Sequence, residues 1–279
     1  MHRQDAPFGR FPGASVLTVN GNVGWFLMEI VSPITFCLAL TTPISPTGSI
    51  LRIPTLAQLA DTFVALPIAR RILAALFLVH YTNRAIVSTI RNPGRAPMHI
   101  SVPLAAIFFN VLNGGLQAFW LAGGVGISRG GGAHGWGLKD TSWATSAFVA
   151  GITLWTAGFI GNIVSDEILY ALKRGRPCSR PNPTPKERYS VPHGFLYSKP
   201  FGGVSHPAYF TEWIEWTGYV LATAALAPTL FPLDALANAG AGKLWITIFP
   251  PPAAAMLKKV PMGLWPLQGW ALQPPALFL

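Results

Sequence analysis

The stretch from residue 143 to residue 172 reads WATSAFVAGITLWTAGFIGNIVSDEILYAL. A helix needs about 20 mostly apolar residues to cross the hydrocarbon core of a membrane, and this stretch is longer than that. Three polar side chains, Asn162, Asp166 and Glu167, follow its more apolar part. Because charged groups are costly in lipid, we expect these side chains to face other helices. The stretch therefore predicts a membrane helix with one polar side, packed inside a helix bundle.

The composition of the whole chain also favours a membrane protein. Of its 279 residues, 51% are hydrophobic and only 11% are charged, whereas a typical soluble domain carries about 25% charged residues. A soluble fold with so few charges would have difficulty covering its surface, but a surface that faces lipid needs none. We therefore expect an all-α fold, a polytopic bundle of transmembrane helices.

Further apolar stretches have the length of membrane spans. They cover residues 23–40, 62–90, 102–121 and 208–230. Pro33 predicts a kink in the first, and Arg70 and Arg71 interrupt the second. The sequence thus predicts about five to six spans. It divides into a polar N-terminal segment (1–22), a membrane bundle (23–232) and an atypical tail rich in Ala, Pro and Leu (233–279).

The formal net charge of the chain is +10, which in a soluble protein would suggest a nucleic-acid partner. Here the basic residues lie in short segments between apolar stretches, as the positive-inside rule describes. We therefore expect the N-terminus, the loop with Arg91 and Arg95 and the segment 173–199 to face the cytosol, and we expect no nucleic-acid partner. The last segment either meets an anionic ligand or is only a solvated topology signal. The six histidines are scattered, so no metal site is expected.

Only ten acidic residues are present, and half of them fall inside or at the ends of apolar stretches. These are Glu29, Asp166, Glu167, Glu212 and Glu215. A charge at the centre of a lipid-embedded helix costs on the order of 3 kcal/mol, so such residues should face the bundle interior. Each is a candidate site residue, and a structural hydrogen bond between helices is the alternative for each.

Several polar residues are spaced three or four apart, which places them on one helix face. The pairs are Asn162 with Asp166, Asn113 with Gln117, Glu212 with Glu215, and His80 with Arg84. A single polar face can simply join two helices, but polar faces on several spans predict a shared polar interior. Within it, Tyr81 and Glu29 would suit the polarisation of a carbonyl oxygen, although a lone membrane tyrosine is more often an interfacial anchor.

Short motifs are more specific evidence when their order along the chain is considered. The chain contains WFLME (25–29), HYTNR (80–84), NGGLQ (113–117), GNIVSD (161–166) and EWIEW (212–216), with a further match at 189–194. This series resembles the motifs of the steroid 5-alpha-reductase family. Each motif alone is modest, but their common order is specific, and together they span about two thirds of the chain.

The resemblance implies an enzyme fold of about seven membrane helices that encloses NADPH and a lipid in the endoplasmic reticulum. It implies that NADPH reduces the carbon–carbon double bond of an enone lipid, such as a 3-oxo-4-ene steroid, while Glu29 and Tyr81 bind the substrate's ketone oxygen. It also implies a set of cofactor-binding residues. These are Arg84, Arg95, Asn113, Asn162, Asp166, Lys173, Tyr189, Glu212 and Glu215.

Some features depart from the family pattern and leave alternatives open. By this resemblance we expect the family's first helix to be shortened here, and the tail after residue 233 lacks the histidines of the family's last helix, which suggests an altered C-terminus. A degenerate, non-catalytic membrane homologue is therefore one alternative. A polyprenyl-lipid or enoyl-CoA reductase of the same superfamily is another. A small transporter would require inverted repeats, and the sequence shows no such internal symmetry. The oligomeric state is not predicted.

Overall fold

The computed structural model describes residues 17–41, 53–122, 142–174 and 207–226. The described part is helical apart from one short strand pair. In chain order the elements are β1 (Thr18–Val19), α1 (Gly21–Thr41), α2 (Leu56–Ala65), α3 (Ile68–Tyr81), η1 (Thr82–Val87), α4 (Ser88–Arg91), β2 (Met98–His99), α5 (Ser101–Leu121), α6 (Ser142–Lys173) and α8 (Pro207–Ala224). The expected all-α class is confirmed for these residues.

Four helical stretches are long and apolar enough to cross a membrane. They are Gly21–Thr41, Ile68–Arg91, Ser101–Leu121 and Trp143–Ala171. Their outer faces carry large exposed apolar side chains, such as Ile34 on α1, Phe108 on α5 and Val149 on α6. Such faces suit contact with lipid, because a bilayer offers polar groups no hydrogen-bonding partner. The chain is therefore an integral membrane protein.

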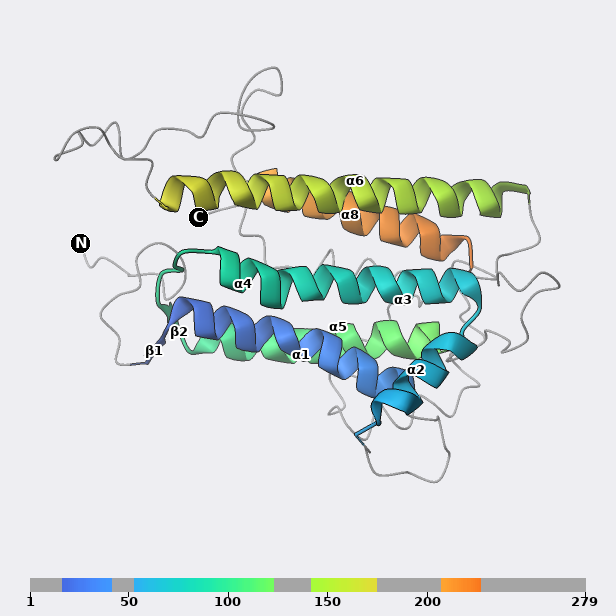
Figure 1. The fold of residues 1–279 in the computed structure, drawn as a ribbon, viewed down its shortest axis with the longest axis horizontal. Helices are drawn as coiled ribbons and strands as arrows, with labels where there is room; N and C mark the ends of the chain where they lie inside the picture. Colours follow the sequence, from blue (N-terminus) through green and yellow to red (C-terminus); the bar gives the residue numbers. More distant parts are fainter. Residues whose placement is uncertain (1–16, 42–52, 123–141, 175–206, 227–279) are drawn as a thin grey trace, which may run out of the picture.

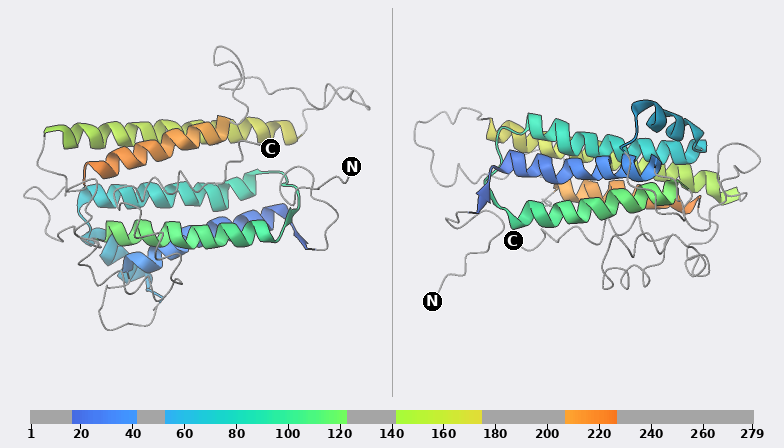
Figure 2. Two further views of the ribbon diagram at one scale, coloured as in Figure 1. Left: turned by 180° about the vertical axis from the view of Figure 1, so that it is seen from behind. Right: turned by 90° about the horizontal axis from the view of Figure 1, so that it is seen from below.

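The helices form two closely packed pairs with a central helix between them. α1 packs along α5, and α6 packs along α8. The stretch made of α3, η1 and α4 lies between these pairs in Figure 1 and in the left view of Figure 2. From there it contacts α1, α5 and α8. Side chains of the central stretch can therefore reach partners on both sides, and this arrangement builds the polar site.

The second predicted span, residues 62–90, is corrected by the structure. The helix breaks at Leu66, whose backbone is extended, and α3 begins after Pro67. Proline disfavours the helical conformation of the residue before it, which accounts for the break. Arg70 and Arg71 therefore lie at the start of α3, near one end of the span. There Arg70 donates to the carbonyl of Leu121, at the end of α5.

The predicted span 208–230 lies only partly within the described residues. Its described part is helix α8, of 18 residues, which is not among the four helices that are apolar enough to span a membrane. It carries Glu212 and Glu215, both of which are fully buried. α8 thus brings two carboxylates to the bundle interior. The tail from residue 233 lies outside the described residues.

Glycines let α6 and α8 approach each other closely. A Cβ atom added at Gly158 would lie 2.3 Å from the backbone nitrogen of Glu215, and one at Gly218 would lie 2.3 Å from the backbone nitrogen of Trp155. Small residues at membrane helix interfaces commonly serve this purpose. The close contact at Gly158 therefore fixes how near the backbone of Glu215 lies to α6.

Replacing Gly158 by Ala is expected to destabilise the protein by about 1–3 kcal/mol, because the new methyl group must push backbone away from backbone. The melting temperature of the detergent-purified protein measures the effect. Gly94→Ala is the matched control, since a Cβ atom there meets nothing within 4 Å. Equal melting temperatures for the two variants would contradict the packing argument.

Candidate functional site

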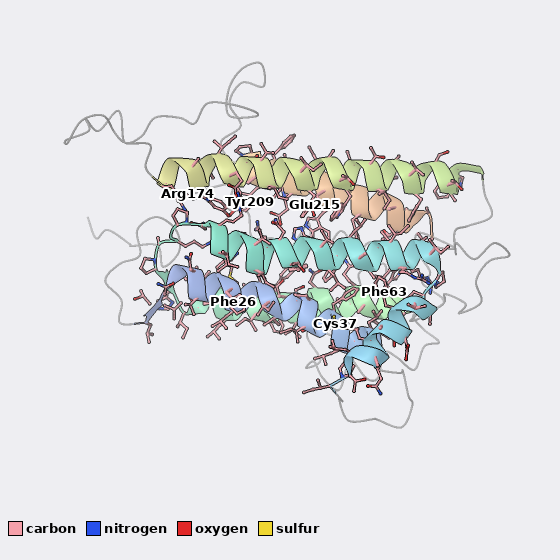
Figure 3. The ribbon with its side chains drawn as sticks, viewed as in Figure 1. Phe26, Cys37, Phe63, Arg174, Tyr209 and Glu215 are labelled. Atoms are coloured by element: carbon pink, nitrogen blue, oxygen red, sulfur yellow. The ribbon has the colours of Figure 1, made fainter. Side chains whose placement is uncertain are left out.

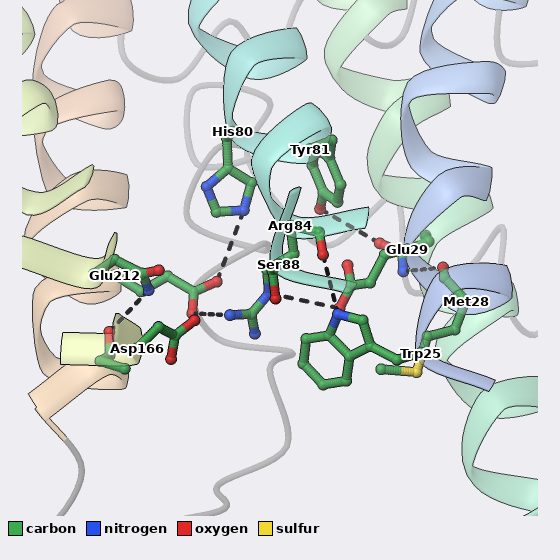
Figure 4. Close-up of polar contacts among 12 residues, drawn as sticks. Trp25, Met28, Glu29, His80, Tyr81, Arg84, Ser88, Asp166 and Glu212 are labelled. Atoms are coloured by element: carbon green, nitrogen blue, oxygen red, sulfur yellow. Dashed lines mark hydrogen bonds and ion pairs between the residues drawn. The ribbon is translucent and has the colours of Figure 1, made fainter. Parts of the chain in front are cut away.

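Buried polar side chains gather where α1, the central stretch, α5, α6 and α8 meet (Figure 4). Glu29 comes from α1, His80 and Tyr81 from α3, and Arg84 from η1. Amides from α5 and carboxylates from α6 and α8 complete the cluster, whose other main members are Asn110, Asn113, Asp166, Glu212 and Glu215. Figure 3 shows Glu215 and Tyr209 reaching from α8 toward the central stretch.

Arg84 stands at the centre of this cluster. Its guanidinium lies 3.6 Å from Glu29 on one side and 3.3 Å from Glu212 on the other. The ring of Trp25 lies beneath it at 4.8 Å, and the indole N–H donates to the Arg84 carbonyl at 3.0 Å. A buried cation requires such compensation, because desolvation of an unpaired charge costs several kcal/mol. Arg84 thereby joins helices from the two packed pairs.

A π-helical turn precedes the end of the central stretch. In η1 the N–H of Ser88 bonds to the carbonyl of Asn83, five residues earlier. Such turns insert one extra residue into a helix and are frequent at functional sites. Here the turn contains Arg84 and rotates Ser88 relative to an ideal α-helix. Ser88 is buried and faces α6, where it meets Tyr170.

His80 lies between the two carboxylates of α8. Its Nδ1 is 2.7 Å from Glu215 and its Nε2 is 3.8 Å from Glu212. The ring also packs against Trp216 at 4.9 Å. The spacing of His80 and Arg84 predicted a shared face, and the structure shows that both side chains meet α8.

Tyr81 turns toward α5. Its hydroxyl donates to the Asn110 carbonyl oxygen at 3.3 Å and accepts from the Asn113 amide at 2.6 Å. Asn110 in turn donates to the backbone carbonyl of Met28 at 2.6 Å, beside Glu29. The two proposed carbonyl-binding residues therefore lie on neighbouring elements that Asn110 connects.

A second set of polar contacts lies at the end of the bundle near α4. Arg95 donates to Ser88 at 2.7 Å and to Asn22 at 3.3 Å, and it packs over the Trp25 ring at 4.4 Å. Lys173 donates to the side chain of Asn92 and to the carbonyl of Gly94. Two of the cations that the family resemblance assigns to the cofactor, Arg95 and Lys173, thus lie at one end of the polar cluster.

These two cations are incompletely compensated by carboxylates. Burial lowers the pKa of Lys173, and the nearby charge of Arg95 acts in the same direction. Burial likewise lowers the pKa of Arg95 below its ordinary value. A lowered pKa of a cation means that desolvation outweighs the attraction of its neighbours. An anionic group bound at this end would offset that cost.

The other predicted residues lie on or near α6, some in the cluster and some outside it. Asn162 donates to the backbone carbonyl of Ala208 at 3.0 Å and so also joins α6 to α8. Asp166, one turn further along α6, accepts from Tyr170 at 3.2 Å. Glu167 instead pairs with Arg91 and Arg174 at the surface. Tyr189 lies outside the described residues.

Sequence reasoning missed some members of the cluster. Tyr170 lies four residues after Asp166, a spacing that places both on one face of α6, so this signal was available. Ser88 could not be placed in the same way, because the π-helical turn shifts its direction. Asn110 was not missed in this way, because it lies close to the predicted polar face of Asn113 and Gln117; the position of Tyr81 shows that Asn110 and Asn113 bind one hydroxyl.

The family model for 3-oxo-5-alpha-steroid 4-dehydrogenase matches residues 96–243 of this chain. The chain belongs to this family. Its named members include steroid 5-alpha-reductases, which are oxidoreductases. The expected family resemblance is therefore confirmed, over a region that includes α5, α6 and α8.

Individual relatives extend the similarity to the N-terminal helices. An uncharacterized protein of Schizosaccharomyces pombe is 34% identical over 227 residues, which cover 78% of this chain and 74% of that protein. The mouse 3-oxo-5-alpha-steroid 4-dehydrogenase 1 is 29% identical over 234 residues, 82% of this chain and 74% of the relative. A steroid 5-alpha-reductase of Arabidopsis thaliana is 28% identical over 227 residues, 79% and 71% of the two chains.

Proposed function

We propose that this protein is an NADPH-dependent reductase that saturates the carbon–carbon double bond of an enone lipid, such as a 3-oxo-4-ene steroid. The observation that carries the proposal is the polar cluster around Glu29, Tyr81 and Arg84, which lies inside an otherwise apolar bundle. Buried ionisable groups in membrane helices mark functional sites by default. The 3-oxo-5-alpha-steroid 4-dehydrogenases among the relatives indicate the class of reaction.

The side chains suit a dinucleotide. One carboxylate oxygen of Glu215 is buried and has no hydrogen-bond partner among the described residues, so it is available to the hydroxyl and amide donors of such a ligand. Arg95 and Lys173, whose positive charges are incompletely compensated, suit its phosphates. We assign Arg84, Asn113, Asn162, Asp166, Glu212 and Tyr189 to the same cofactor. NADPH, when bound, would supply the hydride, and a proton taken up from solution would complete the saturation of the double bond.

Tyr81 and Glu29 are proposed to hold the substrate's carbonyl oxygen, Glu29 in its protonated form, because an ionised carboxylate has no proton to donate. As the double bond is reduced, negative charge develops on this oxygen, and a donor that bonds more strongly to the charged oxygen than to the ketone lowers the barrier. When the substrate binds, the Tyr81 hydroxyl redirects its hydrogen bond from the Asn110 oxygen to the substrate oxygen, while Asn113 keeps donating to the phenolic oxygen. The Asn113 bond strengthens Tyr81 as a donor, because hydrogen bonds in a chain polarise one another.

The proposed setting is the endoplasmic reticulum, with the basic end of the bundle in the cytosol. Arg91, Arg95, Lys173 and Arg174 lie close together at this end, where Lys173 contacts Gly94 and Arg174 donates to the Arg91 carbonyl. The positive-inside rule then places this end on the cytosolic side, where the cofactor would enter.

A direct assay tests the proposal. The detergent-purified protein is mixed with NADPH and a 3-oxo-4-ene steroid, and NADPH loss and the mass of the product are followed. We expect consumption of NADPH and a product two hydrogens heavier. The matched control is the same 3-oxo steroid already saturated at the double bond, which should consume none. No reduction of the steroid, a polyprenyl enone or an enoyl-CoA would contradict the proposal.

A further inference from the structure

A chain of hydrogen bonds connects Arg95 with Asp166 through two hydroxyl groups. Arg95 Nη2 lies 2.7 Å from Ser88 Oγ, Ser88 Oγ lies 2.9 Å from the Tyr170 hydroxyl, and this hydroxyl lies 3.2 Å from Asp166 Oδ2. The four residues come from three segments: α4, the loop that follows it, and α6. Ser88 and Tyr170 are 5% and 4% exposed, so water does not readily replace their partners.

The direction of this chain follows from counting protons. Arg95 can only donate, and an ionised Asp166 can only accept. Each hydroxyl has one proton to donate. Tyr170 uses its proton on Asp166, so Ser88 must donate to the Tyr170 oxygen and accept from Arg95. Each of the two hydroxyls then donates once and accepts once, and hydrogen bonds aligned in this way strengthen one another.

We propose that Tyr170 is a positioning residue that holds Asp166 and, through Ser88, Arg95 in the arrangement that receives the dinucleotide. This inference rests on the proposed function, which assigns Asp166 and Arg95 to the cofactor. Tyr170 would not contact the reacting atoms. Its role is to fix the distance between a cation for the phosphates and a carboxylate for the hydroxyl or amide groups of the same ligand.

A set of variants tests this role. Tyr170→Phe and Ser88→Ala each remove one link, and the double variant removes both. NADPH binding is measured by quenching of tryptophan fluorescence in the detergent-purified protein, and kcat and KM are measured with the enone steroid. For Tyr170→Phe we expect Kd and KM for NADPH to rise about tenfold, as for the loss of a hydrogen bond to a charged group, with kcat unchanged.

The double variant and a control make the test specific. Because both substitutions cut the same path, their effects on Kd should not add. The matched control is Tyr219→Phe, since the Tyr219 hydroxyl is buried and has no hydrogen-bond partner among the described residues. It should bind NADPH as the unmodified protein does.

The outcomes separate the two proposals. If the unmodified protein binds NADPH and Tyr170→Phe binds it equally well, the role of Tyr170 is refuted while the proposed function stands. Additive effects in the double variant, or an equal loss in Tyr219→Phe, refute it as well. If the unmodified protein does not bind NADPH, the proposed function itself fails.

Discussion

Replacing Tyr81 by Phe is expected to lower kcat by about 10²–10³-fold, which is the usual effect of removing one donor to a developing oxyanion. The substitution keeps the ring, which packs against Phe77 at 4.8 Å and against His80 at 4.9 Å. It removes only the hydroxyl that Asn110 and Asn113 hold. The measurement is kcat with the enone steroid and saturating NADPH.

Parallel binding measurements identify the cause of the loss. NADPH affinity should be unchanged, because Tyr81 is proposed to contact the substrate and not the cofactor. The Tyr219→Phe variant removes another buried tyrosine hydroxyl and should keep the full rate. A Tyr81→Phe variant with a normal kcat would remove Tyr81 from the mechanism, whereas a parallel loss of NADPH affinity would point to disruption of the whole cluster.

Replacing Arg84 by Met is expected to destabilise the protein by about 3–5 kcal/mol, because it leaves buried carboxylates without their cation. Glu29 and Glu212 both depend on Arg84, at 3.6 and 3.3 Å. The free energy of unfolding can be measured by titration with a denaturing detergent. A second substitution, Glu212→Gln, should recover part of the loss, because it removes one of the stranded charges.

Arg91→Met provides the matched control for Arg84→Met. The Arg91 side chain is 52% exposed and pairs with Glu167 at the surface, and exposed ion pairs contribute little to stability. Its unfolding free energy should therefore stay close to that of the unmodified protein. If both variants lost the same stability, the central role of Arg84 would be wrong.

The sequence was sufficient to predict the helical class and most members of the polar cluster. The apolar stretches 23–40 and 102–121 match α1 and α5 within two residues. The spacing of Glu212 and Glu215 correctly placed both on one buried face of α8. These predictions succeeded because hydrophobic length and helical periodicity are local properties.

Other features depended on contacts that local patterns do not encode. Pro67 indicated the break at Leu66. The residues on both sides of it are mostly apolar, however, so the sequence pattern predicted one helix where the structure has two. The π-helical turn at Thr82–Val87 changes the direction of Ser88, and a periodicity of 3.6 residues does not show where an extra residue is inserted. Arg84 pairs with Glu29 on one side and with Glu212 on the other. This could be seen only once the central stretch was placed between the two helix pairs.

The layering of the helices also has a consequence for biogenesis. Arg84 and His80 are synthesised about 130 residues before α8, which supplies Glu212 and Glu215. Until α8 has left the ribosome and entered the membrane, Glu29 is the carboxylate partner that the nascent chain offers Arg84. Arrival of α8 therefore completes the ion pairing of Arg84, a cation that an earlier helix has already carried into the bilayer.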